Sequence, residues 1–308
     1  NDSNYSLIDC NAGTIKEIAE KFHNIIITNN EETIWSKQYV NKDLNADNWV
    51  RNRVALLHGP NGYHNWAGTA PTHDLVMAFE TEEGKIPNTL LKPGESTTEN
   101  PYMNREPRFY ASILYNGCQW KGETLYTYEG SVDGYGLGGG TTCTGYYMRK
   151  LFDPEISKSQ MRRTDLTFYY MRYAEVLLIY AEAMAMQDKL TEALEALNEV
   201  RDRVDLPAVS ASTKTEFMKL LRHERMVELA FEGHRFWDLR RWGLATCSME
   251  TCIITGSVGI LFLGYSIYSS LSEPSDVADE ESAAGIAALH SSILDLILDA
   301  SSPDAGVG

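Results

Sequence analysis

Apolar residues recur with helical spacing between residues 168 and 232, the most regular part of the chain. One set falls at positions i, i+3, i+4, i+7, i+10 and i+11, the pattern of one apolar helix face. Its members are Ala174, Leu177, Leu178, Ala181, Met184 and Ala185. A short polar turn at 187–189 separates it from a second set, which consists of Ala193, Leu197, Val200 and Val204. The spacing predicts two helices joined as a hairpin.

A third helix is predicted to begin at Thr213, because Glu216 follows three residues later with the spacing of a capping box. Its apolar residues are Phe217, Leu220, Leu221, Val227 and Phe231, and Gly233 supplies the expected stop. The first two helices resemble a tetratricopeptide unit, in which small residues such as Ala181 and Ala193 let the helix backbones approach closely. One such unit cannot bury its own faces, so either other segments of this chain or helices that are missing from it are expected to pack against it.

The segments before residue 168 are shorter and less regular. We expect short helices at 14–23 and 74–79, extended segments at 24–30 and 32–40, and a turn that leads into an extended segment within 100–117. Residues 41–68 are rich in Asn, Gly, His and Trp and have no sustained period. Binding residues tend to lie in loops of this kind. The pattern therefore indicates a helical second half and a loop-rich first half.

The net charge of -16 argues against a nucleic-acid ligand, whose phosphates require a basic surface. The charge is uneven, since residues 247–308 hold nine acids and no Lys or Arg. We therefore divide the chain into a domain at 1–246 and an atypical acidic, Ser-rich tail at 247–308. Residues 252–271 of this tail carry no charge. A membrane span, a buried helix or strand pair, and a segment foreign to the fold are the open interpretations.

The cysteines and histidines do not follow metal-binding patterns. The five cysteines show no C-x-x-C spacing, and we expect most of them to be free thiols. His58, His64 and His73 are six and nine residues apart, which matches no ligand motif. The Gly- and Tyr-rich stretch 128–147 lacks the spacing of a phosphate-binding or dinucleotide-binding loop. We predict no metal and no cofactor.

Aromatic residues in the loop-like segments are candidates for sugar binding, which needs flat apolar faces together with polar partners for hydroxyl groups. The candidate ligand-binding residues are Tyr63, Asn65, Trp66, Trp120, Tyr126 and Tyr128. The alternative for each aromatic side chain is ordinary packing within its loop.

The stretch 222–243, "RHERMVELAFEGHRFWDLRRWG", concentrates acidic and basic residues in a short span. One interpretation is a set of ion pairs that tie the end of the third helix to its neighbours. The other is a pair of catalytic carboxylates flanking a glycosidic bond, with Glu224 or Glu228 acting beside Asp238. Because arginines outnumber the acids, ion pairing is favoured, and we predict no catalytic residue.

These residues resemble a known family. "YYMRYAEVLLIYAEAM", "LNEVRDRVDLP" and "RHERMVELAFEGHRFWDLRRWG" are similar, in this order, to the C-terminal half of the SusD/RagB family of outer-membrane glycan-binding lipoproteins. The upstream blocks "PTHDLVMAFETEEGK", "NPYMNREPRFYASILYNG" and "GYYMRKLFDP" also agree. The resemblance spans about residues 1–246. It departs at both ends, because the lipidated N-terminus, the first helical repeats and the family's tail signature have no counterpart, and residues 1–9 lack a signal-peptide pattern.

The resemblance implies a mainly α fold, with tetratricopeptide-like helical hairpins and a loop-rich face that binds ligand. It also implies non-catalytic binding of oligosaccharide or another nutrient on the extracellular face of the outer membrane, and delivery to a SusC-like, TonB-dependent transporter. Two alternatives stay open. One is a tetratricopeptide-type scaffold that binds peptides, and the other is a glycoside hydrolase.

Overall fold

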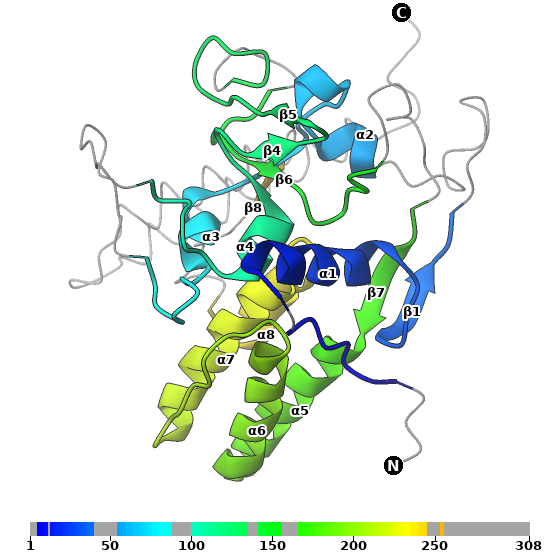
Figure 1. Cartoon of the computed structure of the whole chain (residues 1–308). Coiled ribbons are helices and arrows are strands. Elements are labelled where there is room, and N and C mark those ends of the chain that lie inside the picture. The colour runs from blue at the N-terminus through cyan, green and yellow to red at the C-terminus, as the bar shows by residue number, and fades with distance from the viewer. Residues whose placement is uncertain are drawn as a thin grey trace, which may run out of the picture. The chain divides into compact units, whose positions relative to one another are not determined.

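The computed structural model describes residues 5–11, 13–39, 54–87, 100–134, 141–155, 166–244 and 253–255. The chain divides into two compact units, Asn1–Ser266 and Ile267–Gly308, and all described residues belong to the first. The fold is mainly helical, as predicted, with short two-stranded sheets between the helices (Figure 1).

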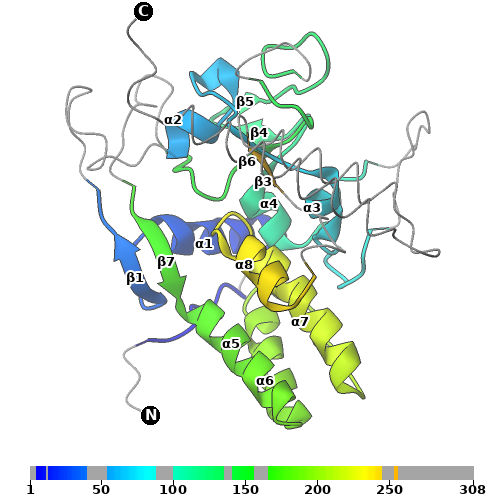
Figure 2. The same ribbon diagram turned by 180° about the vertical axis from the view of Figure 1, so that it is seen from behind.

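Three consecutive helices form the lower part of the molecule in Figures 1 and 2: α5 (Tyr173–Met186), α6 (Leu190–Asp202) and α7 (Lys214–Glu228). The predicted hairpin is α5 with α6, and the third predicted helix is α7. Ala181 and Ala193 are both completely buried, which is consistent with close approach of the two backbones. Large apolar residues of all three helices, such as Leu178, Leu197 and Phe217, share one core. Each side chain of this size stabilises the fold by roughly 1.5–3 kcal/mol through burial.

Helix α7 begins as the capping box predicts and ends earlier than expected. The Glu216 amide donates to Thr213 Oγ1 over 3.2 Å, and the Thr213 amide donates to the Glu216 carboxylate over 3.1 Å. The helix stops at Glu228 because the turn after it places Phe231 at a φ of 66°, outside the helical region. Gly233, with a φ of 85°, then precedes a further helix, α8 (His234–Arg241), which the apolar pattern did not predict.

Removing this cap should weaken the fold measurably. Thr213→Ala is expected to lower the free energy of unfolding by about 1 kcal/mol, because the Glu216 amide at the start of α7 loses its hydrogen-bond acceptor. Urea denaturation of the chain would measure the change. Thr215→Ala is the matched control, since Thr215 is exposed in the same helical turn. An equal effect of both substitutions would contradict the role of the cap.

The remaining elements, apart from the 13-residue helix α1, are short and position the loops. The helices are α1 (Ile15–Ile27), α2 (Val54–His58), α3 (His73–Ala78) and α4 (Pro107–Ser112), with a 3-10 turn at Asn61–Tyr63. The strands are β1 (Thr33–Lys37), β2 (Thr69–Pro71), β3 (Ile113–Leu114), β4 (Gln119–Trp120), β5 (Glu123–Thr124), β6 (Tyr147–Met148), β7 (Phe168–Arg172) and β8 (Ile253–Thr255). They pair as four antiparallel sheets, β1 with β7, β2 with β8, β3 with β6, and β4 with β5.

Two expected extended segments contain helix instead. Residues 24–27 continue α1, because Ile25 and Ile26 extend its buried face. Residues 107–112 form α4, in which Pro107 occupies the first turn, where its missing amide hydrogen costs nothing. The expectation of an extended segment at 32–40 is confirmed by β1.

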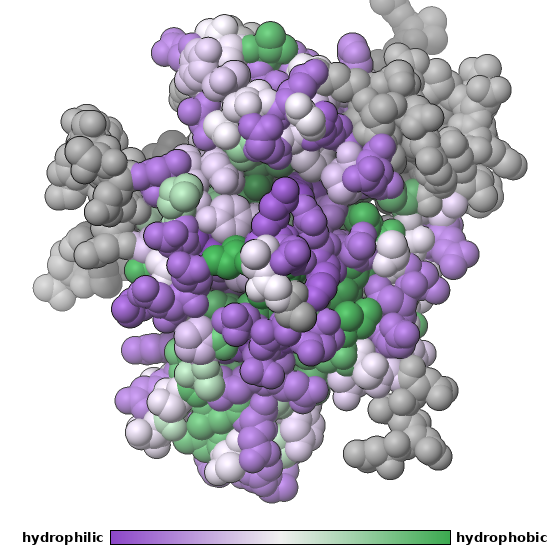
Figure 3. Space-filling view, in the orientation of Figure 1, coloured by the Kyte–Doolittle hydropathy of each residue, from purple (hydrophilic) through white to green (hydrophobic). Residues whose placement is uncertain are grey.

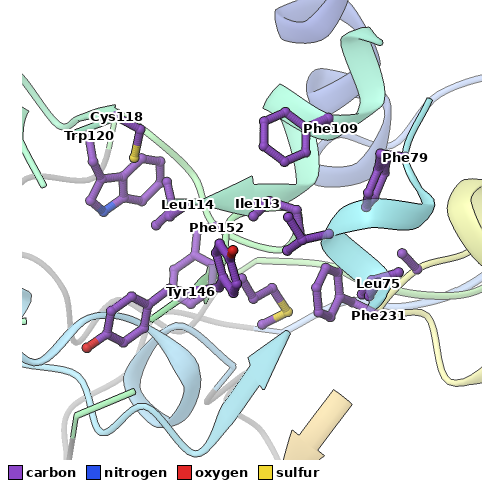
Figure 4. Packing of buried hydrophobic residues seen from close by; sticks show 14 of the residues in the cluster. Leu75, Phe79, Phe109, Ile113, Leu114, Cys118, Trp120, Tyr146, Phe152 and Phe231 are labelled. Carbon is purple, nitrogen blue, oxygen red and sulfur yellow. The ribbon is translucent and has the colours of Figure 1, made fainter. Parts of the chain in front are cut away.

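A second apolar core lies under the loops of the upper part of the molecule. It joins α3, α4, β3 and β6 to the end of α7 through residues that include Phe79, Phe109, Tyr147 and Val227. Figure 4 shows Trp120 beside Cys118 and Leu114 within this core. The core holds the β4–β5 hairpin and the loops around it in place.

Hydrophilic residues predominate on the face shown in Figure 3, and apolar residues appear there in separate small patches. Among the residues that the structure describes, no helix has the length and apolar character needed to cross a membrane. Only 253–255 of the uncharged segment 252–271 is described, and these residues form β8. The interpretations of the rest of that segment lie outside the described residues.

Candidate functional site

A cavity of about 500 Å³ lies beside the β4–β5 hairpin. The hairpin itself is in the upper part of Figure 1, away from α5–α7. Two segments line it. One is the 3-10 turn, with Gly62 and Tyr63, and the other runs from Glu123 to Asp133. We call this cavity, with the exposed rings of Tyr126 and Tyr128 on its wall, the tyrosine site.

Tyr126 and Tyr128 present their rings to solvent, with exposed fractions of 50% and 57%. Thr127 between them is buried. This alternation is typical of an extended segment, in which residues two apart point to the same side. The ring centroids lie 5.7 Å apart and the rings are tilted by 59° to each other. The pair therefore forms an angled aromatic surface rather than a single flat one.

Hydrogen bonds fix the loop that carries the two rings. The Ser131 hydroxyl contacts the carbonyl oxygens of both Tyr126 and Tyr128, at 2.6 and 2.8 Å. The Thr127 amide donates to the Asn116 side chain over 3.0 Å. At Gly134 a Cβ would lie 2.3 Å from the Tyr128 carbonyl oxygen, so only glycine fits there. A loop held in this way loses little conformational entropy when a ligand binds.

Gly62 and Asp133 join the two walls of the tyrosine site. The Gly62 amide donates to Asp133 Oδ1 over 2.6 Å, and a Cβ on Gly62 would lie 2.7 Å from Asp133 Oδ2. The buried Tyr63 hydroxyl donates to the Trp120 carbonyl oxygen over 3.2 Å. Burial, with smaller contributions from Glu123 and Asp133, raises the pKa of Tyr63 to about 12, so this hydroxyl stays protonated at neutral pH.

A second hollow, of about 580 Å³, lies among α1, α4 and the β3–β4 region. Its aromatic side chains already pack against other residues of the chain. The ring of Tyr115 stacks on that of Tyr102, with centroids 4.4 Å apart, and the Tyr110 hydroxyl donates to the Tyr102 carbonyl oxygen. Because these rings pack on their neighbours, this hollow offers less stacking surface than the tyrosine site.

The chain matches the model of the SusD family over residues 31–282, which is more than half of its length. It belongs to the SusD family. SusD-like protein P38 of Formosa agariphila is 27% identical over 191 residues, covering 59% of this chain and 32% of that protein. SusD-like protein P2 of the same organism is 35% identical over 89 residues, covering 26% and 18%.

Solved SusD-like structures share the fold. A SusD-like protein from Bacteroides fragilis superposes with a TM-score of 0.66 at 29% identity, covering 79% of this chain and 48% of that one. A SusD-like carbohydrate-binding protein from the same species gives a TM-score of 0.60 at 27% identity, with coverages of 75% and 49%. The chain thus spans about half of these SusD-like structures and about a third of P38. The family and the fold class predicted from the sequence are confirmed.

The match to the SusD family runs past residue 246, where we placed the end of the domain. Strand β8, at Ile253–Thr255, also pairs with β2, at Thr69–Pro71. The division at residue 246 stays a prediction.

The structure separates the six residues predicted to bind ligand into two groups. Tyr126, Tyr128 and Trp66 are exposed, and Trp66 lies in the loop after the 3-10 turn with an exposed fraction of 63%. Tyr63, Asn65 and Trp120 are buried. The Trp120 indole packs in the core of Figure 4, so neither ring face is open to a ligand. Burial follows from β4, in which Gln119 points outward and its neighbour inward.

Several polar residues of the tyrosine site were not among the candidates. Glu123, Thr124, Ser131 and Asp133 line the cavity or fix its loop. The signal that could have found them is their position in one Gly-flanked stretch with the two tyrosines, "GETLYTYEGSVDG".

The histidines do not form a metal site with other side chains in the part of the chain that the structure describes. Within the described ranges, no three His, Cys, Asp or Glu side chains are grouped as a metal site. His73 Nδ1 instead lies 3.0 Å from the Tyr146 hydroxyl.

The charged stretch 222–243 forms a buried ion network. Glu228, the last residue of α7, is completely buried and contacts the guanidinium groups of Arg108 at 3.0 Å, Arg172 at 2.6 Å and Arg203. Glu232 pairs with Arg172 and Lys150, each at 2.7 Å. These contacts link α7 to α4, β7 and the end of α6. The network therefore ties the helical part to the part that carries the loops.

The same geometry bears on the two interpretations of this stretch. Glu224 is buried against Arg108 and Arg201, and Asp238 is buried against Arg225 and Arg241. A glycosidase needs two carboxyl groups that reach the sugar from opposite sides. The three acids proposed for that role lie in ion pairs, so the structure favours the structural interpretation.

Acid should weaken this network. Burial alone would raise the pKa of Glu232, yet Arg172 and Lys150 outweigh burial and lower it to about 2, and three arginines hold the pKa of Glu228 below its ordinary value. The unfolded chain therefore binds more protons as the pH falls. Stability is fully present above about pH 4.5 and is lost as the pH falls towards 2.

Thermal melts between pH 6 and pH 3 test this expectation. The melting temperature should fall steadily below pH 4.5, and Glu232→Gln should reduce the slope, because one of the titrating groups is then missing. A melting temperature that stays constant over this range would contradict the role of the network.

Proposed function

We propose that this chain binds oligosaccharide at the tyrosine site and does not cleave it. The observation that carries the proposal is the pair of fixed, exposed tyrosine rings on the wall of a 500 Å³ cavity. Membership of the SusD family supports it, and a solved relative is described as a SusD-like carbohydrate-binding protein.

The chemistry of the site suits a sugar. A tyrosine ring can lie against the C–H face of a pyranose, while its hydroxyl group reaches polar atoms at the rim. Thr124 and Ser131 add hydroxyl groups, and Glu123 adds a carboxylate. A small-molecule site typically has a volume of 300–1,000 Å³, so the cavity has room for one or two sugar rings of a longer chain. The exposed Trp66 is proposed as a further contact near the 3-10 turn.

The cellular role is the second part of the proposal. The SusD/RagB resemblance supports a place on the extracellular face of the outer membrane and delivery of bound oligosaccharide to a SusC-like, TonB-dependent transporter. Co-purification of the full-length natural protein with such a transporter would test it. Recovery without any outer-membrane protein would count against it.

The binding proposal is tested by affinity electrophoresis of the chain in gels that contain β-glucan, xylan or mannan, after circular dichroism has shown that it is folded. Retardation by at least one polysaccharide, with no release of reducing ends, is expected. Release of reducing ends by the folded chain would support a glycoside hydrolase instead. A folded chain that no polysaccharide retards would contradict the proposal.

A further inference from the structure

We propose that the tyrosine site selects uncharged oligosaccharides and rejects sulfated or uronic-acid glycans. This inference rests on the proposed function and adds the class of ligand. Its basis is the charge of both walls. Residues 122–148 contain Glu123, Glu129 and Asp133 and no Lys or Arg.

The carboxylates lie at the cavity itself. Glu123 and Asp133 line it, and the exposed Glu129 is placed between the lining residues Tyr128 and Gly130. None of the described residues that line the cavity is Lys, Arg or His. The opposite wall comes from the loop 59–68, which has no Lys or Arg and one histidine, the exposed His64.

The nearest basic residues in the sequence are directed elsewhere. The Lys121 ammonium donates to the carbonyl oxygens of Asp153, at 2.8 Å, and Pro154, at 3.3 Å. Arg149 donates to the Tyr110 carbonyl oxygen over 2.6 Å and lines the second hollow. Neither residue lines the tyrosine site, so neither is placed to neutralise a bound anion there.

The chemistry of recognition follows from this distribution. Proteins recognise sulfate and carboxylate groups mainly with arginine and lysine, which form charge-assisted hydrogen bonds. A glycan anion in this cavity would find no such donor among the described residues that line it, and would meet two or three carboxylates in a partly desolvated space. Sugar hydroxyl groups, in contrast, donate well to carboxylates. Electrostatic repulsion provides specificity here, because it weakens binding of a charged glycan without weakening binding of a neutral one.

The test compares one polysaccharide in two forms. The probes are whichever of β-glucan, xylan or mannan the chain retains and its sulfated derivative prepared from the same batch, with polygalacturonate as a uronic-acid probe. We expect the sulfated form to bind at least about tenfold more weakly at low salt. The difference should shrink in 0.5 M NaCl, where the Debye length is only about 4 Å.

The variant Glu123→Gln/Glu129→Gln tests whether the carboxylates cause the difference in affinity between the neutral and the sulfated polysaccharide. Both side chains are exposed, and glutamine keeps the size and the hydrogen-bonding oxygen of glutamate. In this variant the ratio of the dissociation constants of the sulfated and the neutral form should fall several-fold. Both forms are measured on the same variant, so a lost hydroxyl contact affects both constants and leaves the ratio to report the charge. Glu192→Gln/Glu195→Gln on the exposed side of α6 is the matched control and should leave the ratio unchanged.

The possible results distinguish failure of the charge selectivity from failure of sugar binding itself. Equal or tighter binding of the sulfated form or of polygalacturonate would overturn the inference and leave sugar binding standing. An unchanged ratio in the Glu123→Gln/Glu129→Gln variant would also overturn it, because the carboxylates would not be the cause. Binding of no polysaccharide in any form would overturn the proposed function and the inference with it.

Discussion

Glu228→Gln is expected to lower the free energy of unfolding by about 3 kcal/mol, because the substitution removes a buried carboxylate that three arginines share. The loss lies at the low end for a broken buried ion pair, since each arginine keeps another acidic partner. The glutamine amide can still accept a hydrogen bond, yet it cannot neutralise a guanidinium group. The loss is a large fraction of the stability of an ordinary domain. Urea denaturation followed by circular dichroism would measure it.

The matched control for this experiment is Glu195→Gln, at an exposed position on α6. A substitution on the surface away from special contacts usually changes the free energy of unfolding by less than about 0.5 kcal/mol. Failure of Glu228→Gln to fold, together with normal folding of the control, would agree with the account. Equal stability of the two variants would show that the network contributes nothing to the fold.

Tyr126→Ala/Tyr128→Ala is expected to weaken binding of the retained polysaccharide about a hundredfold. Each ring is then a major contact, and loss of about 1.5 kcal/mol per ring adds up to roughly two powers of ten in the dissociation constant. The melting temperature should change little, because both rings are about half exposed. Isothermal titration calorimetry with a soluble oligosaccharide of that polysaccharide would measure the affinity.

An exposed aromatic pair elsewhere provides the control. Trp35 on β1 and Tyr170 on β7 lie with their ring centroids 4.9 Å apart and are also exposed, at 63% and 42%. Trp35→Ala/Tyr170→Ala removes a comparable aromatic area from a different sheet. We expect the affinity of this variant for the oligosaccharide to be unchanged. A hundredfold loss here, with none in the tyrosine variant, would move the binding site to the β1–β7 sheet.

The helical part of the fold could be predicted because its signals are local. The apolar stripe from Ala174 to Ala185 repeats within a single helix, and the capping box of Thr213 and Glu216 spans one turn. Helix α4 is harder to recognise, because six residues after a proline are too few to show a period. The end of α7 was missed because a left-handed Phe231 is unusual for a bulky residue.

The ion network could not be read from local spacing. Arg108 and Glu228 are 120 residues apart in the chain, and Arg172 and Glu228 are 56 apart. The sequence indicated ion pairing within 222–243, whereas several of the basic partners come from α4, β7 and the residues after α6 and β6. Ion pairs between residues that are far apart in the chain have no characteristic spacing, so the sequence does not reveal them.

The candidate site could be predicted only in part. Aromatic residues in loop-like stretches of the sequence are recognisable as candidates, and Tyr126 and Tyr128 do line a cavity. Trp120 was indistinguishable from them in the sequence, because the strand that buries it has only two residues. Glu123 and Asp133 stand in the same Gly-flanked stretch as the two tyrosines, but only the fold shows that Asp133 meets Gly62 across the cavity.

Hydrogen–deuterium exchange of the whole chain, with and without a saturating neutral oligosaccharide, tests the central claim most directly. The account predicts slower exchange in the peptides that cover residues 59–66 and 122–134, and little change in those that cover β1, β7 and α1. Protection confined to other segments, or no protection at a concentration that saturates binding, would show that the tyrosine site is not where the sugar binds.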